Sequence, residues 1–383
     1  MKYPLMADCI SAEEKQVIAD FILTSDRYTQ GPKTKEFEEA WSRWLGTKYS
    51  IFVGSGSAAN LLILSAVKEL FFEHKTPRIL TSVCTWSTNI SSCMQMQYDI
   101  VFADMDKHDY GIDVSNIEGD VDIVLVTHLM GIPSNLRAIK QRFPKALIIE
   151  DCCESHGAVY EGQKVGTHGL ASSFSFYFGH HMTTIEGGMI GTNDRQLYNL
   201  LLAKRSHGMS REMQKDVRDS YSEMFPDVDP QFLFVTDGFN SRASDLQAVI
   251  GLGQIEKLDN SIAARSANYA RFKEMVERIA GGNLELPKGE GNSSFCLPFV
   301  CKTVAMRRDL KNAMHQGGIE TRPFLVGNVM RQPFMRAYKA PVVPNAEHMH
   351  HKAFYIGNHP YLDDSFFTTL GGILSEYFNL YDS

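Results

Sequence analysis

Two adjacent histidines, His180 and His181, lie in the segment 175–188, whose other residues are mostly aromatic, hydroxyl-bearing or glycine. An imidazole exchanges protons near neutral pH, so either ring suits an acid or base role. Adjacent residues of a strand or loop point in different directions, which makes the pair a poor site for one metal ion. Without further context, a packed or exposed histidine is the simpler explanation of each ring.

Three other segments carry groups suited to a flat, anionic ligand. Residues 54–60 are mostly small and are expected to join a strand to a helix, which leaves backbone N–H groups free for a phosphate. Asp151 follows a buried apolar run, where open α/β sheets bind ligands, and a carboxylate there pairs with a protonated heterocyclic nitrogen. Trp86 follows another such run, where an indole can stack on a flat ring.

Each segment also has an ordinary structural explanation. The small residues suit a tight strand–helix turn, and they match neither Gly-x-Gly-x-x-Gly, because position 59 is alanine, nor a P-loop, which needs a lysine. Asp151 suits a helix cap or a satisfied core acid, and Trp86 suits the core. The polar residues of segment 238–247, which precede a helix, suit capping.

The elements that position these groups alternate between strand and helix. Thr34 is expected to cap a helix that contains Phe37 and Trp41, and residues 207–237 are expected to form a long loop. Apolar runs of strand length between helices indicate a mostly parallel sheet covered on both faces. Strands are predicted at 49–53, 78–82, 100–103, 121–127, 146–149, 172–178 and 188–192, and further helices at 57–72, 86–97, 194–205, 244–258 and 262–279.

Length and composition narrow the classes of function. The 383 residues suit one large domain, 1–260, and one small C-terminal domain, 261–383, with which the N-terminal segment can pack. The net charge of −7 without a basic run argues against nucleic-acid binding, and no apolar stretch approaches the ~18 residues that cross a bilayer. Seven cysteines without a Cys-x-x-Cys pair predict free thiols, a reducing cytoplasm and no metal or iron–sulfur cluster.

In order and spacing, these segments resemble the sugar aminotransferases of the aspartate-aminotransferase fold (fold type I), over nearly the whole chain. The small-residue turn, the aromatic, the strand-end aspartate, a loop ending in Thr-Thr-Ile-Glu-Gly-Gly188 and a Gly-Phe-Asn-x-Arg segment all occur in sequence. The resemblance implies an α/β fold, with a large domain built on a mostly parallel mixed sheet and a smaller C-terminal α/β domain. It also implies pyridoxal 5′-phosphate (PLP), interconverted with pyridoxamine 5′-phosphate (PMP), and a homodimer with shared sites.

The resemblance assigns a role to each group. The phosphate would be held by Gly56, Ser57, the backbone at Ala58, Ser175 and, from the partner subunit, the residue corresponding to Asn240. Trp86 would stack on the ring, Asp151 would pair with its nitrogen, and Glu154 would lie near its 3-oxygen. The residues implied in substrate binding are Arg242, Arg322, Asn328 and His359.

One departure from the aminotransferase pattern is informative. Counting back from Glu186 places His180 where those enzymes have the lysine that binds PLP covalently, and no lysine occurs between Lys164 and Lys204. Histidine cannot make that bond but can still move protons. The pattern resembles the nucleotide-sugar 3-dehydratases that lack an iron–sulfur cluster.

This branch implies a specific reaction. L-glutamate would convert PLP to PMP, and a nucleotide-linked 4-keto-6-deoxy sugar, most simply GDP-4-keto-6-deoxy-D-mannose, would then lose its 3-hydroxyl, with His180 moving the protons in both halves. Two alternatives stay open: a nucleotide-sugar 4-aminotransferase that works without lysine, and a non-catalytic PLP-binding homologue.

Overall fold

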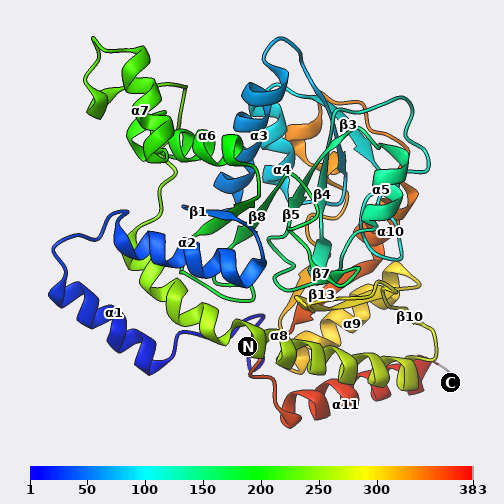
Figure 1. Cartoon of the computed structure of the whole chain (residues 1–383). Helices are drawn as coiled ribbons and strands as arrows, with labels where there is room; N and C mark the ends of the chain where they lie inside the picture. The colour runs from blue at the N-terminus through cyan, green and yellow to red at the C-terminus, as the bar shows by residue number, and fades with distance from the viewer. Residues whose placement is uncertain (382–383) are drawn as a thin grey trace.

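A seven-stranded sheet forms the centre of the larger part of the molecule in the computed structural model, which describes residues 1–381 (Figure 1). Its strand order is β1-β9-β8-β5-β4-β2-β3, and β9 runs antiparallel to both of its neighbours while the other pairs are parallel. The strands are β1 (Tyr49–Val53), β2 (Arg78–Ser82), β3 (Asp99–Ala103), β4 (Ile123–Thr127), β5 (Leu147–Asp151), β8 (Ala171–Ser175) and β9 (Gly188–Thr192). The predicted mostly parallel sheet is confirmed.

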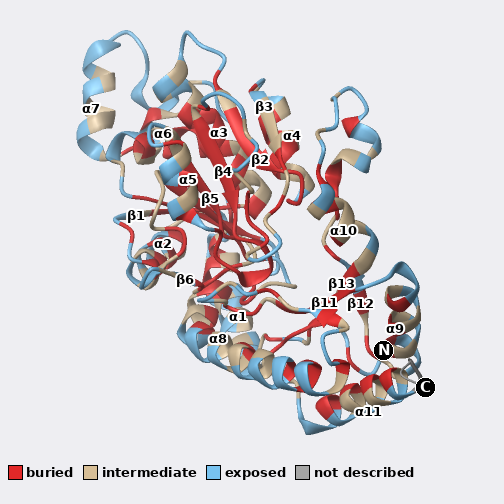
Figure 2. Cartoon of the chain, turned by 90° about the vertical axis from the view of Figure 1, so that its right-hand side faces the viewer, coloured by how far each residue is buried: buried red, intermediate tan, exposed pale blue. Residues whose placement is uncertain are grey.

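Helices cover both faces of this sheet, because its strands are apolar on both sides. Along β4, Ile123 and Leu125 pack in a cluster with α3 (Gly56–Phe72) and α6 (Arg195–Arg205), whereas Val124 and Val126 pack with α5 (Leu136–Arg142). Toward β1, the second face is covered by α2 (Pro32–Leu45) and α8 (Asp245–Ala280). Figure 2 shows the buried strands enclosed between partly exposed helices.

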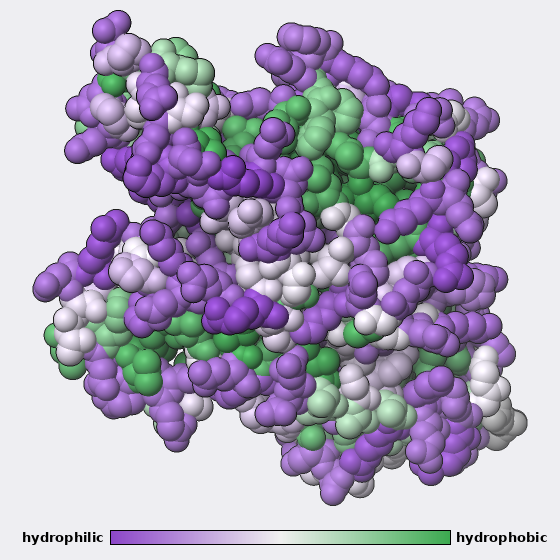
Figure 3. All heavy atoms as spheres, in the orientation of Figure 1, coloured by the Kyte–Doolittle hydropathy of each residue, from purple (hydrophilic) through white to green (hydrophobic). Residues whose placement is uncertain are grey.

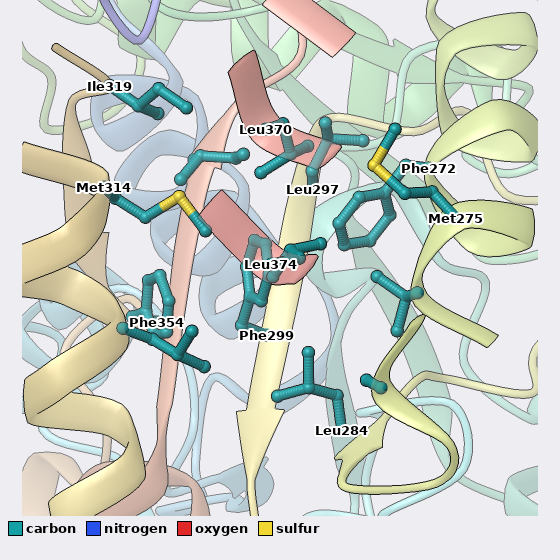
Figure 4. Packing of buried hydrophobic residues seen from close by; sticks show 14 of the residues in the cluster. Phe272, Met275, Leu284, Leu297, Phe299, Met314, Ile319, Phe354, Leu370 and Leu374 are labelled. Atoms are coloured by element: carbon teal, nitrogen blue, oxygen red, sulfur yellow. The ribbon is translucent and has the colours of Figure 1, made fainter. Parts of the chain in front are cut away.

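A smaller unit is built on a four-stranded antiparallel sheet, ordered β10-β11-β13-β12. Its core packs against α8, α9 (Val304–Gln316) and α11 (Asp364–Tyr381), as Figure 4 shows for the labelled residues. Phe299 and Phe354 stack at its centre with their rings 4.7 Å apart. The strands are β10 (Leu284–Glu285), β11 (Cys296–Cys301), β12 (Thr321–Pro323) and β13 (Ala353–Gly357).

The remaining elements lie around these two sheets. A short hairpin is formed by β6 (Val159–Tyr160) and β7 (Gln163–Lys164). The other helices are α1 (Ala12–Thr24), α4 (Ser87–Gln95), α7 (Lys215–Met224) and α10 (Pro344–Lys352). Single 3₁₀ turns occur at Leu129–Gly131, Ser210–Glu212, Pro230–Phe232, Val329–Arg331 and Pro333–Met335. Among residues 1–381, no helix is long and apolar enough to cross a membrane. All seven cysteines are free thiols.

Three predictions of local structure are wrong. The two helices predicted at 244–258 and 262–279 are one helix, α8, because the polar residues between them neither cap nor break it. A capping box at Ser244 precedes this helix, and Gly281, whose φ is +55°, follows its last residue. The loop predicted at 207–237 contains α7. Thr34 is no cap, since α2 already begins at Pro32; its N–H and hydroxyl instead bond the Asp245 carboxylate.

The division into domains at residue 260 stays a prediction. That residue lies inside α8, whose first half packs through Leu258 with the larger part and whose second half packs through Phe272 with the small sheet. The N-terminal segment contacts the smaller unit, because Tyr3 pairs with Ile319 and packs in the same core.

Candidate functional site

A cavity of about 1310 Å³ lies where the central strands end and the smaller unit begins. Thr127, Asp151 and Ser175, the last residues of β4, β5 and β8, all line it. This is the edge at which open α/β sheets bind ligands. Residues of the small sheet and its connections, including Arg322 and Tyr355, line the opposite wall.

The first turn of α3 forms one wall of the cavity. Ser55 caps this helix by accepting a hydrogen bond from the N–H of Ala58 at 3.0 Å, so that N–H is not free for the phosphate role predicted for it. The Ser57 hydroxyl lies 2.9 Å from that of Thr88. A Cβ atom on Gly56 would lie 2.7 Å from both the Ser175 Cβ and the Cys153 Sγ, so only glycine lets the helix approach β8 this closely. A helix N-terminus packed tightly against a serine is suited to an anion.

The Asp151 carboxylate is held in a fixed orientation beside this wall. It is buried, and it accepts hydrogen bonds from the side-chain amide of Asn89 at 2.5 Å and from the N–H of Cys153 at 3.0 Å. Asn89 also bonds the hydroxyls of Thr85 and Thr127. Sequence reasoning missed Asn89, because it lies in the polar first turn of α4, where an asparagine has nothing in the sequence to distinguish it.

Trp86 borders the cavity and is not a core residue. Its side chain is 51% exposed, unlike that of the buried Trp41. A large aromatic surface left half exposed at a cavity rim is available for stacking. This finding removes the core explanation that stood beside the stacking role.

The two histidines differ sharply in their surroundings. His180 lines the cavity, and its Nδ1 is buried without a hydrogen-bond partner. Burial and then the nearby charge of Arg265 lower the pKa of His180 to about 3, so the ring is neutral at physiological pH. His181 is buried outside the cavity lining, with its Nε2 3.0 Å from the carbonyl oxygen of Ser293. Of these two adjacent rings, only His180 is placed to exchange a proton with a ligand in the cavity.

Glu154 is a partly buried carboxyl group in the same cavity. One donor, the N–H of Met130 at 2.9 Å, bonds it. Burial, with a smaller contribution from the charge of Asp151, raises the pKa of Glu154 to about 8 despite that hydrogen bond. The group is therefore mostly protonated at neutral pH and can donate a hydrogen bond to a ligand oxygen.

Five predicted site residues lie outside the cavity lining: Ala58, whose N–H bonds Ser55, and Asn240, Arg242, Asn328 and His359. Asn240 and Arg242 are exposed and bond each other, with 3.1 Å between the amide oxygen and the guanidinium Nε. Asn328 is buried, where it bonds Glu347 and caps the turn at Met330. His359 is also buried, and neither ring nitrogen has a partner. Their predicted contacts with cofactor or substrate stay predictions.

The other predicted residues are brought together. Gly56, Ser57, Trp86, Asp151, Glu154, Ser175, His180 and Arg322 all line the cavity. Arg322 is exposed there and forms an ion pair with Glu320 at 2.8 Å. No lysine is found among the residues lining this cavity in the described part of the chain.

These groups fit PLP. The first turn of α3 with Ser57 and Ser175 suits a phosphate, the oriented Asp151 carboxylate suits a protonated ring nitrogen, and the half-exposed Trp86 suits the face of a ring. The close packing at Gly56, which a Cβ would disrupt, brings the phosphate-binding wall and the carboxylate strand into one site.

Comparison with known proteins agrees with this site. The profile of the DegT/DnrJ/EryC1/StrS aminotransferase family matches residues 8–371. The chain is 30% identical over 375 residues to GDP-4-keto-6-deoxy-D-mannose 3-dehydratase of Yersinia pseudotuberculosis, covering 94% of each chain. It is also 30% identical over 377 residues to the enzyme of that name from Escherichia coli O55:H7, covering 94% of this chain and 96% of the relative.

A solved structure of similar fold shows which ligands a relative binds. GDP-4-keto-6-deoxymannose-3-dehydratase with a trapped PLP-glutamate geminal diamine superimposes with a TM-score of 0.86 at 29% identity, over 97% of this chain and 100% of the other. A variant of that dehydratase with bound GDP-perosamine gives a TM-score of 0.87 at 28% identity, with the same coverage. These structures confirm the predicted fold.

Proposed function

Because the chain belongs to the DegT/DnrJ/EryC1/StrS aminotransferase family, we propose that it is a PLP- and L-glutamate-dependent 3-dehydratase of a nucleotide-linked 4-keto-6-deoxyhexose. The proposed substrate is GDP-4-keto-6-deoxy-D-mannose, the sugar in the names of the two 30%-identical relatives. The observation that carries the proposal is His180, a neutral imidazole in a cavity that no described lysine lines.

The cofactor supplies an electron sink when it is bound, which holds the electron pair left when a proton leaves the neighbouring carbon. Gly56, Ser57 and Ser175 would hold its phosphate, Trp86 would stack on its ring, and Asp151, oriented by Asn89, would keep its nitrogen protonated. Glu154 would donate a hydrogen bond to its 3-oxygen, which requires the protonated form that the raised pKa supplies.

His180 moves the protons in both halves of the proposed reaction. Its Nδ1 is buried against the protein, which leaves Nε2 to face a ligand. In the first half, Nε2 would take the α-proton of L-glutamate and deliver it to the cofactor, and the carbon skeleton would leave as 2-oxoglutarate. In the second half, Nε2 would take a proton back from the cofactor and give it to the departing 3-hydroxyl of the sugar. A base that starts neutral is what the first transfer needs.

Product analysis tests this proposal. GDP-4-keto-6-deoxy-D-mannose and its CDP and TDP analogues would each be incubated with enzyme, PLP and L-glutamate, and the products weighed by mass spectrometry. We expect the GDP sugar to lose one oxygen and gain no nitrogen, while 2-oxoglutarate and ammonia accumulate. A 4-amino sugar that retains its 3-hydroxyl would identify an aminotransferase instead, and cofactor binding without turnover of any sugar would identify a non-catalytic homologue.

A homodimer with shared sites is a further part of the proposal. Asn240 and Arg242 are exposed and outside their own chain's cavity, as expected if they reach the phosphate site of a second copy. Hydrophobic side chains are also exposed on α1, at the lower left of Figure 3, and they belong to Val17, Ile22 and Leu23. Such side chains suit an interface.

Sedimentation and one substitution test the dimer. We expect Asn240→Ala to weaken PLP binding about 10- to 100-fold, the loss of one hydrogen bond to a charged group. Asn116→Ala, at an exposed asparagine that bonds only the neighbouring Ser115, is the control and should change PLP binding little. A fully active monomer would refute shared sites. A cytoplasmic location stays a prediction, which cell fractionation would test.

A further inference from the structure

Arg265, in the middle of α8, has a side chain that is fully buried behind the cavity. Its guanidinium donates hydrogen bonds to three backbone carbonyl oxygens, those of His180 at 3.1 Å, Phe295 at 3.0 Å and Asn358 at 2.5 Å. A second contact of Nη2 is the sulfur of Met6, at 3.5 Å. None of the ion pairs formed within residues 1–381 includes Arg265.

A second buried arginine shows what is unusual about this one. Arg205 is 3% exposed and forms an ion pair with Glu38 at 2.6 Å, so its charge is balanced where it is buried. Carbonyl oxygens accept hydrogen bonds from both Nη atoms of Arg265, but they do not cancel its charge, and its buried Nε has no partner among the described residues. An unbalanced buried charge is expensive, and an apolar side chain of similar length would fill the space at lower cost.

The three carbonyls come from three separate segments. His180 belongs to the loop between β8 and β9, Phe295 precedes β11, and Asn358 follows β13. The guanidinium therefore ties the loop that carries His180 to two strands of the small sheet.

Charged and titratable side chains surround His180. His156 after β5 lies 6.1 Å away between ring centroids, and Tyr177 lies 6.3 Å away in the same loop as His180 and His181. Burial lowers the pKa values of His156 and His181 well below their usual range, so both are neutral. The other charged and titratable side chains that line the cavity belong to Asp151, Cys153, Glu154, Glu186, Cys296, Arg307, Glu320, Arg322, His350, His351 and Tyr355. Arg265 is the cation in direct hydrogen-bond contact with the His180 segment.

We propose that Arg265 is a positioning residue for His180: its guanidinium fixes the backbone of residue 180 and presents an unbalanced positive charge behind the imidazole. The inference rests on the proposed function, in which His180 must accept a proton. A cation behind the ring disfavours a second positive charge on it, which agrees with the lowered pKa of His180, for which burial is the larger cause. The ring is thereby kept in the form that can act as a base.

Two substitutions separate the charge from the packing. Arg265→Met removes the charge and all three hydrogen bonds, whereas Arg265→Lys keeps the charge. Histidine labelled with ¹³C in the full-length holoenzyme would report the protonation of each ring, and a His180→Asn spectrum would assign the signal. The pH dependence of 2-oxoglutarate formation from L-glutamate would be measured on the same samples.

In the unchanged chain we expect the His180 ring to stay neutral down to the acid limit of the fold. In Arg265→Met we expect it to titrate about one to two pH units higher, the change expected when a charge a few ångströms away is removed at an effective dielectric constant of about 20. The acid side of the pH profile of 2-oxoglutarate formation should shift by the same amount. In Arg265→Lys, the pKa of His180 and the acid side of this pH profile should each stay within about half a pH unit of the unchanged chain, which a purely structural role would not predict.

A paired control removes the other buried arginine together with its partner. The double variant Glu38→Gln, Arg205→Met loses a buried ion pair and should leave the His180 titration unchanged, even if its stability falls. If Arg265→Met does not fold, Arg265→Gln removes the charge while keeping N–H donors, and the same shift is expected. An unchanged titration and an unchanged acid limb in the folded charge-removing variant would overturn the inference. Its failure is distinct from that of the proposed function, because the spectrum needs no sugar substrate.

Discussion

Strand β5 and the segment that follows it carry two acids of opposite character, Glu150 within the strand and the partly buried Glu154 beyond its end. Glu150, fully buried, accepts hydrogen bonds from three backbone N–H groups, at residues 166, 168 and 169, and lies 3.0 Å from His128 Nε2. Burial alone would raise the pKa of Glu150. The hydrogen bond from His128 and the other donors outweigh burial, so the pKa of Glu150 is lowered. On the cavity side, Glu154 has one donor and a raised pKa. Burial is common to both, so the number of donors decides the difference.

Two histidines repeat this contrast. His128 uses both nitrogens, since Nδ1 accepts from the N–H of Ser134 at 3.0 Å and Nε2 is left to donate to Glu150. Among residues 1–381, the buried Nδ1 of His180 has no hydrogen-bond partner. A polar group whose bonds are complete stabilises the fold, whereas one left incomplete beside a cavity is available to a ligand. The groups that remain available to a ligand therefore lie on the cavity side, beyond the end of β5.

The largest effect expected from this comparison is on activity. His180→Asn removes the proposed base, and we expect 2-oxoglutarate formation and sugar dehydration to fall at least 10³-fold, within the range of general acid–base catalysis. Because the buried Nδ1 of this ring has no hydrogen-bond partner among the described residues, the free energy of unfolding should change by less than about 1 kcal/mol. Activity is followed by product formation and stability by urea unfolding. Retained turnover would break the comparison.

At Glu150 we expect stability to change instead. Glu150→Gln turns a four-fold acceptor into a side chain with one acceptor atom, so buried N–H groups lose their partner. The free energy of unfolding should fall by about 3–5 kcal/mol. Glu161→Gln is the matched control, because Glu161 forms only an exposed ion pair with Arg137 and should cost at most about 1 kcal/mol. Equal losses of unfolding free energy in the two variants would contradict a stabilising role for the hydrogen bonds of Glu150.

The pH dependence of stability sharpens the contrast through Glu154. Its pKa is raised to about 8 in the folded chain from an ordinary 4.5, so the folded state binds the proton more tightly. The protonated Glu154 side chain therefore stabilises the folded state fully below pH 4.5, and this stabilisation is lost as pH rises toward 8. Glu154→Gln removes this titration, and above pH 8 the variant should be more stable than the unchanged chain by at most a few kcal/mol. If the free energy of unfolding depends on pH in the same way in the unchanged chain and in Glu154→Gln, the pKa of Glu154 is not raised.

The smallest effect is expected at the neighbouring histidine. His181→Asn loses one hydrogen bond to the carbonyl of Ser293, outside the cavity lining, so catalysis should fall less than about tenfold. The same assays as for His180→Asn measure it. A loss as large as that of His180→Asn would mean that the two adjacent rings share the proton transfer.

Much of the site could be predicted because it depends on local order along the chain. Asp151 follows from an apolar run that ends at a carboxylate, and His180 follows from counting back from Glu186. Arg265 could not be predicted, because its partners are backbone carbonyls of residues distant in sequence, which leave no mark on side-chain type. The continuity of α8 was missed for a related reason: tertiary packing on both halves maintains a helix through a polar stretch that local preference would end there.

Because α8 is continuous, one rigid helix connects the cores of the two units. A helix of 36 residues is about 54 Å long, and the two halves of α8 are anchored in different cores. Turning one sheet relative to the other would require α8 to bend or one of its halves to leave its core. The spacing between the two sheets, and with it the width of the cavity, therefore depends on this helix, whereas the large exposed aromatic side chains that line the cavity, Trp86, Tyr177 and Phe178, can turn without disturbing either core.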